Sequence, residues 1–316
     1  MPANNPVTLL KEVKRAERLM GNSFEITIVA EEEEWAYSKI EIAIAEIRRI
    51  EKLLTTFNEN SQTNQINKLA GIAPVIVDKE VFYLIKRALR ISAITDGAFD
   101  ITYGSIDKRL WNFDKSMTSL PDANTAKEMV RLINYLNVIL NEGDYSVMLK
   151  EEGMRIGFGG IGKGYAAEMA KALLKKEGVK SGIVNASGDL TAWGTQTNGK
   201  PWTIGIADPD NAHLPFSYMN VTDTAVATSG NYEKFVKIGG RKYSHTINPK
   251  TGLPVTGIKS VTIISPNAEI ADALATPVTI MGITAGINLI NQVQHVECII
   301  INDDDKIFSS KNINFK

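Results

Sequence analysis

The segment Arg241–Val255 reads RKYSHTINPKTGLPV and contains His245, one of only three histidines in the chain. Its first half is typical of a short strand. A turn follows at Asn248–Gly252, in which Pro249 fixes one backbone dihedral angle and Gly252 can adopt a positive φ. An imidazole at a rigid corner is held in one place, as a general base must be. By itself, the segment is compatible with a general base or with a histidine packed beside an ordinary hairpin.

The composition of the 316 residues is that of a globular protein, with 44% hydrophobic and 22% charged residues. The formal net charge is −1 and the sequence pI is about 6.4, so no overall field favours nucleic acid or an anionic membrane. The single cysteine, Cys298, excludes a disulfide framework and a thiolate zinc site within the chain. No apolar stretch has the length of a transmembrane segment.

The first twenty residues, MPANNPVTLLKEVKRAERLM, carry charges where a signal peptide has an apolar segment. Taken literally, the sequence predicts a cytoplasmic protein. A periplasmic or membrane-anchored protein whose leader had been removed would look the same, so this alternative stays open. No internal repeat or linker marks a boundary, and we expect residues 1–316 to form a single unit.

Helical and strand patterns alternate along the chain, and several consecutive strands are close enough to form hairpins. The expected helices cover residues 5–19, 34–55, 79–95, 163–177, 267–281 and 284–292, with a short one after the N-cap residue Ser61. The expected strands cover residues 24–30, 74–77, 154–156, 182–185, 190–193, 202–207, 218–221, 225–229, 233–238, 242–246 and 259–264, followed by two closing strands. Hairpins interleaved with helices indicate an α+β fold rather than a doubly wound parallel sheet.

Residues 157–164, with the sequence GFGGIGKG, form a glycine-rich turn before a helix. They fit the dinucleotide fingerprint G-x-G-x-x-G, but about 150 residues of other structure precede them. They also approach a P-loop, except that Gly164 stands where a Ser or Thr would hold magnesium. Glycines allow close backbone approach and a helix N-terminus offers free N–H groups, so the turn predicts either a phosphate site or a tight strand-to-helix corner.

The expected helix 267–281 brings several oxygen atoms together. Asp272 and Thr276 are four residues apart and therefore share one face. Pro277 cannot donate a hydrogen bond to the carbonyl of Ala273, and it should kink the helix. A carboxylate, a hydroxyl and a freed carbonyl suit a hard cation such as Mg²⁺, although a polar face turned to water would give the same pattern.

Two further polar turns follow strands. Asn185–Asp189 reads NASGD and Thr228–Tyr232 reads TSGNY. Short polar residues of this kind line binding sites, but they also form ordinary hairpin turns. The sequence alone does not decide between these two roles.

Eight motifs of this chain, in the same order, resemble those of the ApbE-type FAD:protein FMN transferases, also called flavin transferases. The resemblance spans nearly the whole chain. The motifs are Met20-Gly21, Phe57 with Ser61–Asn67, Gly97–Asp100, Gly159–Tyr165, Asn185–Asp189, Thr228–Tyr232, His245–Gly252 and Asp272–Thr276. The resemblance implies one ApbE-like (T-fold-like) α+β unit of mixed, largely antiparallel sheets packed with helices.

Members of this family bind FAD and Mg²⁺ and transfer FMN onto a Thr or Ser hydroxyl of an acceptor protein, releasing AMP. The resemblance implies FAD as the substrate and an acceptor flavoprotein subunit as the partner. It assigns Mg²⁺ to Asp272, Thr276 and a backbone carbonyl near Gly162. It assigns the removal of the acceptor's proton to His245. Contacts with FAD are assigned to Met20, Phe57, Ala98, Phe99, Asp100, Lys163 and Ile247.

Two positions depart from the family pattern. Gly157 and Asn248 each stand where the family commonly has Asp. The change at Asn248 removes a negative charge near His245, an effect expected to lower the basicity of the imidazole. Three alternatives to a transferase stay open. The chain could be a hydrolase that splits FAD into FMN and AMP, or a flavin-binding protein with little turnover. The glycine turn also leaves open an NAD-linked oxidoreductase.

Overall fold

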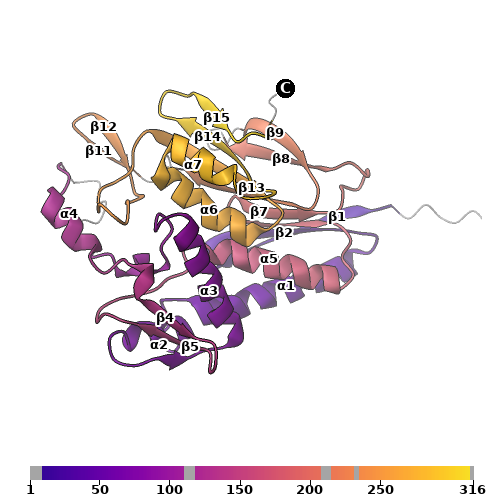
Figure 1. Cartoon of the computed structure of the whole chain (residues 1–316). Coiled ribbons are helices and arrows are strands. Elements are labelled where there is room, and N and C mark those ends of the chain that lie inside the picture. Colours follow the sequence, from indigo (N-terminus) through magenta and orange to yellow (C-terminus); the bar gives the residue numbers. More distant parts are fainter. Residues whose placement is uncertain (1–8, 110–117, 208–214, 231–234, 314–316) are drawn as a thin grey trace, which may run out of the picture.

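The computed structural model of the chain describes residues 9–109, 118–207, 215–230 and 235–313. The central element is an antiparallel sheet in which eight strands follow the order β1-β2-β6-β7-β10-β13-β14-β15 (Figure 1). Its strands are β1 (Lys11–Leu19), β2 (Asn22–Ala30), β6 (Gly182–Ala186), β7 (Asp189–Trp193), β10 (Thr224–Gly230), β13 (Ile258–Ser265), β14 (Glu297–Asn302) and β15 (Ile307–Ser309). The smaller sheets in the described ranges are β8 (Trp202–Ala207) with β9 (Pro215–Val221), β11 (Phe235–Ile238) with β12 (Arg241–Ser244), and β3 (Val75–Ile76), β5 (Ser146–Leu149) and β4 (Val138–Asn141).

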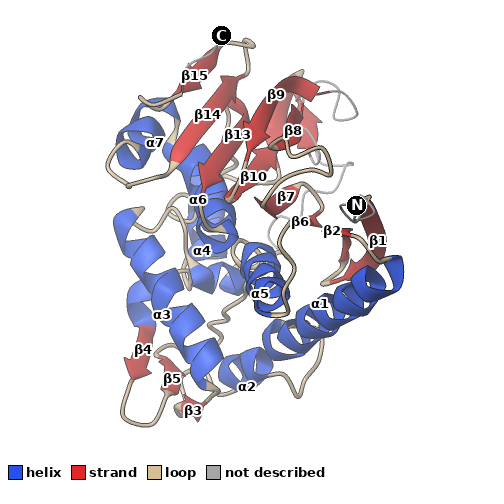
Figure 2. Cartoon of the chain, turned by 90° about the vertical axis from the view of Figure 1, so that its right-hand side faces the viewer, coloured by secondary structure: helices blue, strands red, loops and turns tan. Residues whose placement is uncertain are grey.

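Three helices cover one face of the main sheet. Helix α1 packs on β1 and β2, α5 on β6 and β7, and α6 on β10 and β13 (Figure 2). The α-helices of the described residues are α1 (Glu33–Leu54), α2 (Gln62–Lys68), α3 (Lys79–Ile94), α4 (Ala123–Val130), α5 (Gly162–Lys176), α6 (Ala268–Met281) and α7 (Ile283–Ile290). Two short 3-10 helices, η1 (Ile101–Ser105) and η2 (Tyr135–Asn137), complete them. Helices packed on antiparallel sheets confirm the predicted α+β class.

The apolar spacing of α1 explains how it packs on the sheet. Ile40, Ile44 and Ile47 are 0% exposed and recur every three or four residues, which places them on one face of the helix. They meet the alternate side chains Phe24 and Ile26 of β2 in the main core cluster. Burial of each such side chain contributes about 1.5–3 kcal/mol. The predicted helix 34–55 is therefore confirmed.

Strand β7 separates two layers by simple alternation. Leu190 and Ala192 belong to a cluster with Trp202 and Ile204, which places the β8–β9 hairpin on the face opposite the helices. Thr191, which lies between Leu190 and Ala192 in the strand, instead accepts a hydrogen bond from Lys171 of α5. Because side chains of a strand point alternately to its two faces, Asp189, the first residue of β7, also faces the helices.

The N-terminal segment was predicted as a helix over residues 5–19, and this prediction is wrong for its described part. Residues 11–19 form strand β1, which pairs with β2 along its full length. Met20 and Gly21 make the two-residue hairpin turn, with φ of 51° and 73°. Val13 and Leu19 are buried, so the apolar period is two rather than the helical 3.6.

The expected strand at 154–156 is also absent. Ile156 is paired with a side chain rather than with a neighbouring strand, because Asn67 donates from Nδ2 to the Ile156 carbonyl over 3.0 Å and accepts from its N–H over 2.7 Å. An amide side chain can mimic the peptide group of a strand in this way. The contact ties α2 to the chain just before the glycine turn. Residues 233 and 234 of another expected strand lie outside the described residues.

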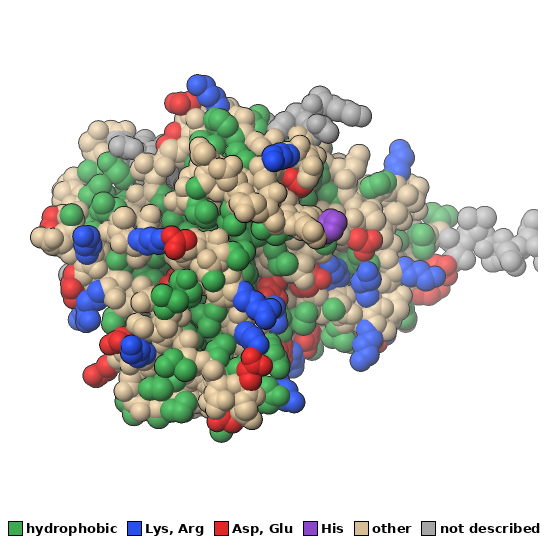
Figure 3. Space-filling view, viewed as in Figure 1, with side chains coloured by type: hydrophobic (Ala, Val, Ile, Leu, Met, Phe, Trp, Pro, Cys, Tyr) green, Lys and Arg blue, Asp and Glu red, His purple; other side chains and the backbone are tan. Residues whose placement is uncertain are grey.

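On the face shown in Figure 3, acidic and basic side chains are interspersed, which agrees with a net charge of −1. Among the described residues, no helix combines the length and apolar character that crossing a membrane requires. Cys298 is buried in strand β14. That residues 1–316 form a single unit stays a prediction.

Candidate active site

Helices α5 and α6 cross at Gly164. A Cβ atom at this position would lie 2.2 Å from the Ala268 carbonyl oxygen and 2.6 Å from the Cβ of Asp272. No larger residue fits between the two backbones. Gly164, the position that departs from a P-loop, is therefore required by close helix packing, which brings the N-terminal turn of α5 against the first turns of α6.

Asp272 is the buried carboxylate at this crossing, with 6% of its surface exposed. Its Oδ2 accepts a hydrogen bond of 2.8 Å from the backbone N–H of Gly164. Burial raises the pKa of the Asp272 carboxyl, the Lys163 ammonium acts against this shift, and the neighbouring Asp189 adds to it. The prediction that Asp272 could face water is thus wrong, and its carboxylate lies in a constrained, charged environment.

Lys163 joins Asp272 to a second buried carboxylate. Its Nζ forms an ion pair with Asp189 and lies 3.9 Å from Asp272 Oδ1. Asp189 is 7% exposed, and its other oxygen accepts from the Thr228 N–H over 3.2 Å. We call Lys163, Asp189 and Asp272 the charged triad. Its members come from α5, β7 and α6.

Asp189 was not among the predicted site residues, although the turn that contains it was noted. The turn places Ser187 and Gly188 at φ of 55° and 101°, as a two-residue hairpin connection between β6 and β7 requires. The turn thus forms the predicted hairpin, and it places Asp189 on the helix face of the sheet; that the turn lines a binding site stays a prediction. The aspartate directly after the turn was the available signal.

The oxygen donors around Asp272 fit a magnesium ion. Thr276 lies half-buried one helical turn further on, and Pro277, inside α6, leaves the Ala273 carbonyl without its helical donor. Within the described residues no group of three or more His, Cys, Asp or Glu side chains is placed to hold a metal ion, so hydroxyl and carbonyl oxygens would have to complete such a site. Carboxylate, hydroxyl and carbonyl oxygens are the donors that Mg²⁺ prefers. Gly162, the first residue of α5, is two residues from the N–H that meets Asp272.

The glycine turn and the segment 97–101 lie side by side. A Cβ at Gly160 would be 3.5 Å from the Phe99 ring, and the Gly157 N–H donates to the Ile101 carbonyl over 3.0 Å. Phe99 and Ala98 are buried at 7% and 8% exposure. Two motifs about sixty residues apart in the sequence thus form one surface next to the start of α5.

The carboxylate of Asp100 is engaged inside the protein. One oxygen accepts from the N–H and hydroxyl of Thr102 over 2.8 and 2.6 Å, and the other accepts from the Tyr135 N–H over 2.8 Å. Burial raises the pKa of the Asp100 carboxyl, although these hydrogen bonds oppose the shift. Its side chain braces η1 against η2, and its contact with FAD stays a prediction.

Met20 and Phe57 lie in two connecting segments, where Met20 is partly buried and Phe57 is exposed. Met20 occupies the β1–β2 turn, and its Cε would be 3.5 Å from a Cβ on Gly162, so it borders the start of α5. Phe57 follows α1 and is 99% exposed. Ser61, the confirmed N-cap of α2, donates from its hydroxyl to the Thr55 carbonyl over 2.6 Å and stabilises this loop. An aromatic ring so exposed is open to stack on a planar ligand.

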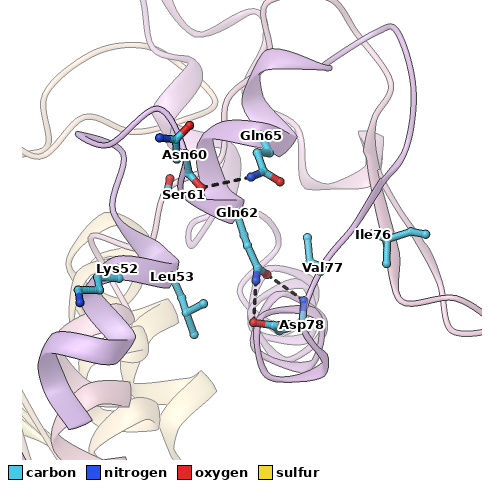
Figure 4. A pocket seen from close by; sticks show the side chains of 9 residues that line it. All are labelled: Lys52, Leu53, Asn60, Ser61, Gln62, Gln65, Ile76, Val77 and Asp78. Atoms are coloured by element: carbon cyan, nitrogen blue, oxygen red, sulfur yellow. Dashed lines mark hydrogen bonds between the residues drawn. The ribbon is translucent and has the colours of Figure 1, made fainter. Parts of the chain in front are cut away.

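A cavity of about 380 Å³ lies near this loop (Figure 4). Gln62 donates to the carboxylate of Asp78 over 2.7 Å and accepts from its N–H over 2.8 Å, so the main polar groups of its wall bind each other. None of the predicted site residues line it. The lining residues are Lys52, Leu53, Asn60, Ser61, Gln62, Gln65, Ile76, Val77 and Asp78.

The histidine segment forms the predicted turn. His245 is exposed directly after β12. Gly252 has φ of 71° and donates to the Asn248 carbonyl over 2.9 Å. A Cβ on Gly252 would be 1.9 Å from the Ala126 carbonyl oxygen, so the turn presses against α4. The turn can take no larger residue at this position.

The same segment borders residues 96–103, which include the motif Gly97–Asp100. Ile247 is 1% exposed and packs with Met129 of α4. Burial raises the pKa of Tyr103 to about 12, although a hydrogen bond with the Ile247 backbone acts to lower the pKa. Lys250 pairs with Asp96. The histidine segment thus adjoins residues 96–103, which in turn adjoin the glycine turn.

Comparison with known proteins gives consistent matches. A model of the ApbE family matches residues 20–300. A FAD:protein FMN transferase of Treponema pallidum (strain Nichols) is 29% identical, covering 96% of this chain and 88% of that protein. One from Klebsiella pneumoniae (strain 342) is 30% identical, covering 92% of this chain and 90% of that protein.

Solved structures match in fold as well. The ApbE protein from Thermotoga maritima has a TM-score of 0.84 at 29% identity, covering 95% of this chain and 97% of its own. The flavinyl transferase ApbE of Pseudomonas stutzeri, in its apo form, has a TM-score of 0.83 at 24% identity, covering 96% of each chain. The ApbE-like fold expected from the sequence is confirmed.

Proposed function

Because the chain belongs to the ApbE family, we propose that it transfers FMN from FAD to a Thr or Ser hydroxyl of an acceptor protein, with Mg²⁺, and releases AMP. It is an enzyme of the FAD:protein FMN transferase kind, like its relatives from Treponema and Klebsiella. The buried charged triad at the α5–α6 crossing is the single observation that carries this proposal. It supplies negative charge for a cation and positive charge for a pyrophosphate in one place.

The reaction is a displacement at phosphorus. The acceptor hydroxyl oxygen forms a bond to the phosphorus of the FMN half, and the bond from that phosphorus to the AMP oxygen breaks, with its electron pair leaving on AMP. The hydroxyl proton passes to the imidazole of His245. Such a reaction depends mainly on positioning and on charge neutralisation. Asp272, Thr276 and the backbone near Gly162 would hold a Mg²⁺ ion, which would supply part of that charge neutralisation.

Features of the fold support this assignment of roles. Lys163 presents an ammonium 3.9 Å from Asp272, where an anionic pyrophosphate would be attracted. Phe57 offers an exposed ring for the flavin or adenine. We also assign contacts with FAD to Met20, Ala98, Phe99, Asp100 and Ile247.

The alternative of an NAD-linked oxidoreductase that uses the glycine turn is wrong. A dinucleotide fingerprint joins a strand to a helix in a parallel βαβ unit. Here residues 154–156 form no strand, and the strands around α5 pair antiparallel. Hydrolysis of FAD is the second candidate, because His245 is exposed and could take a proton from water as readily as from an acceptor.

The test is AMP release from FAD with Mg²⁺, with and without an acceptor protein that carries a flavinylation threonine. We expect acceptor-dependent AMP and a flavin-labelled acceptor, both lost in His245→Asn and Asp272→Asn. His295→Asn, at another exposed histidine, is the matched control and should keep full activity. AMP without acceptor would identify a hydrolase, and FAD binding without AMP would leave a flavin-binding protein.

A further inference from the structure

Lys163 holds unequal positions towards the two carboxylates of the charged triad. It contacts Asp189 directly as an ion pair, whereas it lies 3.9 Å from Asp272 Oδ1. Both carboxylates are more than nine-tenths buried, at 7% and 6% exposure. One ammonium thus serves two buried negative charges, and it is drawn to the side of Asp189.

Asp189 is rigidly placed to exert this pull. It is the first residue of β7, which lies between β6 and β10 inside the main sheet. The Thr228 N–H of β10 binds one of its oxygens, and the Asn185 side chain closes the preceding turn by accepting from the Gly188 N–H over 2.8 Å. A carboxylate fixed on a central strand moves little, so its ion pair fixes Lys163 as well.

Without Asp189, the nearest buried negative charge for Lys163 is Asp272. The ammonium would then compete with a cation for the carboxylate that the proposed function requires as a metal ligand. A lysine side chain has four rotatable bonds and reaches either partner. The ion pair with Asp189 therefore determines whether Asp272 is open to a cation.

We propose that Asp189 is a positioning residue that holds Lys163 away from Asp272, which keeps Asp272 open for the cation and directs the ammonium to the pyrophosphate of the substrate. This inference rests on the proposed function and adds a residue to which no role was assigned. Asp189 itself touches neither the substrate nor the cation. Its effect is transmitted through Lys163.

A second lysine of α5 provides a comparison within the chain. Lys171 lies two turns along the helix, pairs with Glu168 over 2.7 Å and donates to the Thr191 hydroxyl over 3.0 Å. Asp189 and Thr191 are two residues apart and so lie on the same face of β7. Both lysines reach that face, but only Lys163 also approaches Asp272. The Lys163 contact is therefore more than a general means of docking α5 on the sheet.

The test is Mn²⁺ and Mg²⁺ affinity by calorimetry, without FAD, for the wild type, Lys163→Gln, Asp189→Asn and the double variant. We expect Lys163→Gln to bind the cation about tenfold more tightly and Asp189→Asn about tenfold more weakly. In the Lys163→Gln background, Asp189→Asn should change affinity less than twofold, because its effect acts through the lysine. Lys175→Gln makes the same charge change at an exposed position of α5 and should leave affinity unchanged.

The double variant separates positioning from simple charge loss. An equal loss of affinity from Asp189→Asn in both backgrounds would overturn the inference, since it would show a direct effect of the aspartate or a damaged fold. Circular dichroism and melting temperatures of all variants report on the fold. If the wild type binds neither cation at millimolar concentration, the metal dependence of the proposed function fails instead. A raised KM for FAD in Asp189→Asn is a further expected result.

Discussion

The backbone N–H of Gly164 donates a 2.8 Å hydrogen bond to the carboxylate of Asp272, at a crossing where the two helices leave no room for a side chain. One residue thus has two effects. It lets α5 and α6 approach closely, and it binds the carboxylate that is central to the site. The geometry of the site therefore depends on helix packing as much as on the charged residues.

Gly164→Ala is the direct test of this relationship. An added methyl group would lie 2.2 Å from the Ala268 carbonyl oxygen, so the helices must separate. We expect the free energy of unfolding to fall by about 3 kcal/mol. Gly159→Ala is the control, because nothing lies within 4 Å of a Cβ there. Urea unfolding of both variants measures the difference, and an equal effect would contradict the packing explanation.

Gly252→Ala tests the turn that carries His245. Its φ of 71° disfavours alanine, and a methyl group would lie 1.9 Å from the Ala126 carbonyl oxygen. We expect AMP release to fall at least about tenfold, because His245 moves with the turn. Gly257→Ala shares a positive φ of 93° but has open space. If both variants lose the same activity, backbone strain rather than the contact with α4 explains the result.

Phe57→Ala should affect binding without affecting the fold. The ring is 99% exposed, so its removal should change the free energy of unfolding by less than about 0.5 kcal/mol. Loss of stacking should weaken FAD binding about fivefold to tenfold. Flavin fluorescence titration measures this change. Leu136→Ala, at a residue 72% exposed, is the control, and unchanged FAD affinity in Phe57→Ala would remove Phe57 from the site.

Glu80 predicts a pH dependence of stability. Its carboxylate accepts hydrogen bonds from Arg49 over 2.7 Å and from the Tyr165 hydroxyl over 2.6 Å, and it joins α1, α3 and α5. Burial by itself would raise the pKa of Glu80, but these two partners outweigh it and lower the pKa. A lowered folded-state pKa contributes stability above the unfolded value of about 4.3, and this contribution is lost as the pH falls through the folded value.

Glu80→Gln should therefore lower the free energy of unfolding by about 1 kcal/mol at pH 7, and the difference from the wild type should shrink below about pH 4. Urea unfolding at pH 7 and pH 3.5 measures both values. Glu151→Gln, at an exposed position, is the control and should show neither effect. A difference that stays constant with pH would mean that the ion pair does not account for the lowered pKa.

Local sequence patterns correctly predicted the helices and turns that depend only on neighbouring residues. The spacing of Ile40, Ile44 and Ile47 predicted α1, and Ser61 predicted the start of α2. The turn at Asn248–Gly252 followed from Pro and Gly alone. In each case the physical preference acts over a few neighbouring residues, so it can be read from the chain without knowing the fold.

Patterns that depend on a distant partner were misread or left open. Residues 11–19 look helical, but their pairing with β2 makes them a strand. The segment at 154–156 looks like a strand, but the Asn67 side chain takes the place of a neighbour. Propensity is a weak preference, and tertiary pairing overrides it.

By itself, the sequence determined the α+β class, the resemblance to a family and the residue types of the site. It singled out Asp272, Lys163 and His245 because each belongs to a local motif. Only the tertiary structure decided that Lys163 pairs with Asp189, that Asp100 braces η1 against η2, and that Gly164 is required by packing against Asp272. These contacts join residues 26 to 108 positions apart, and a distance in space between such residues is set by how sheets and helices pack, not by neighbours along the chain.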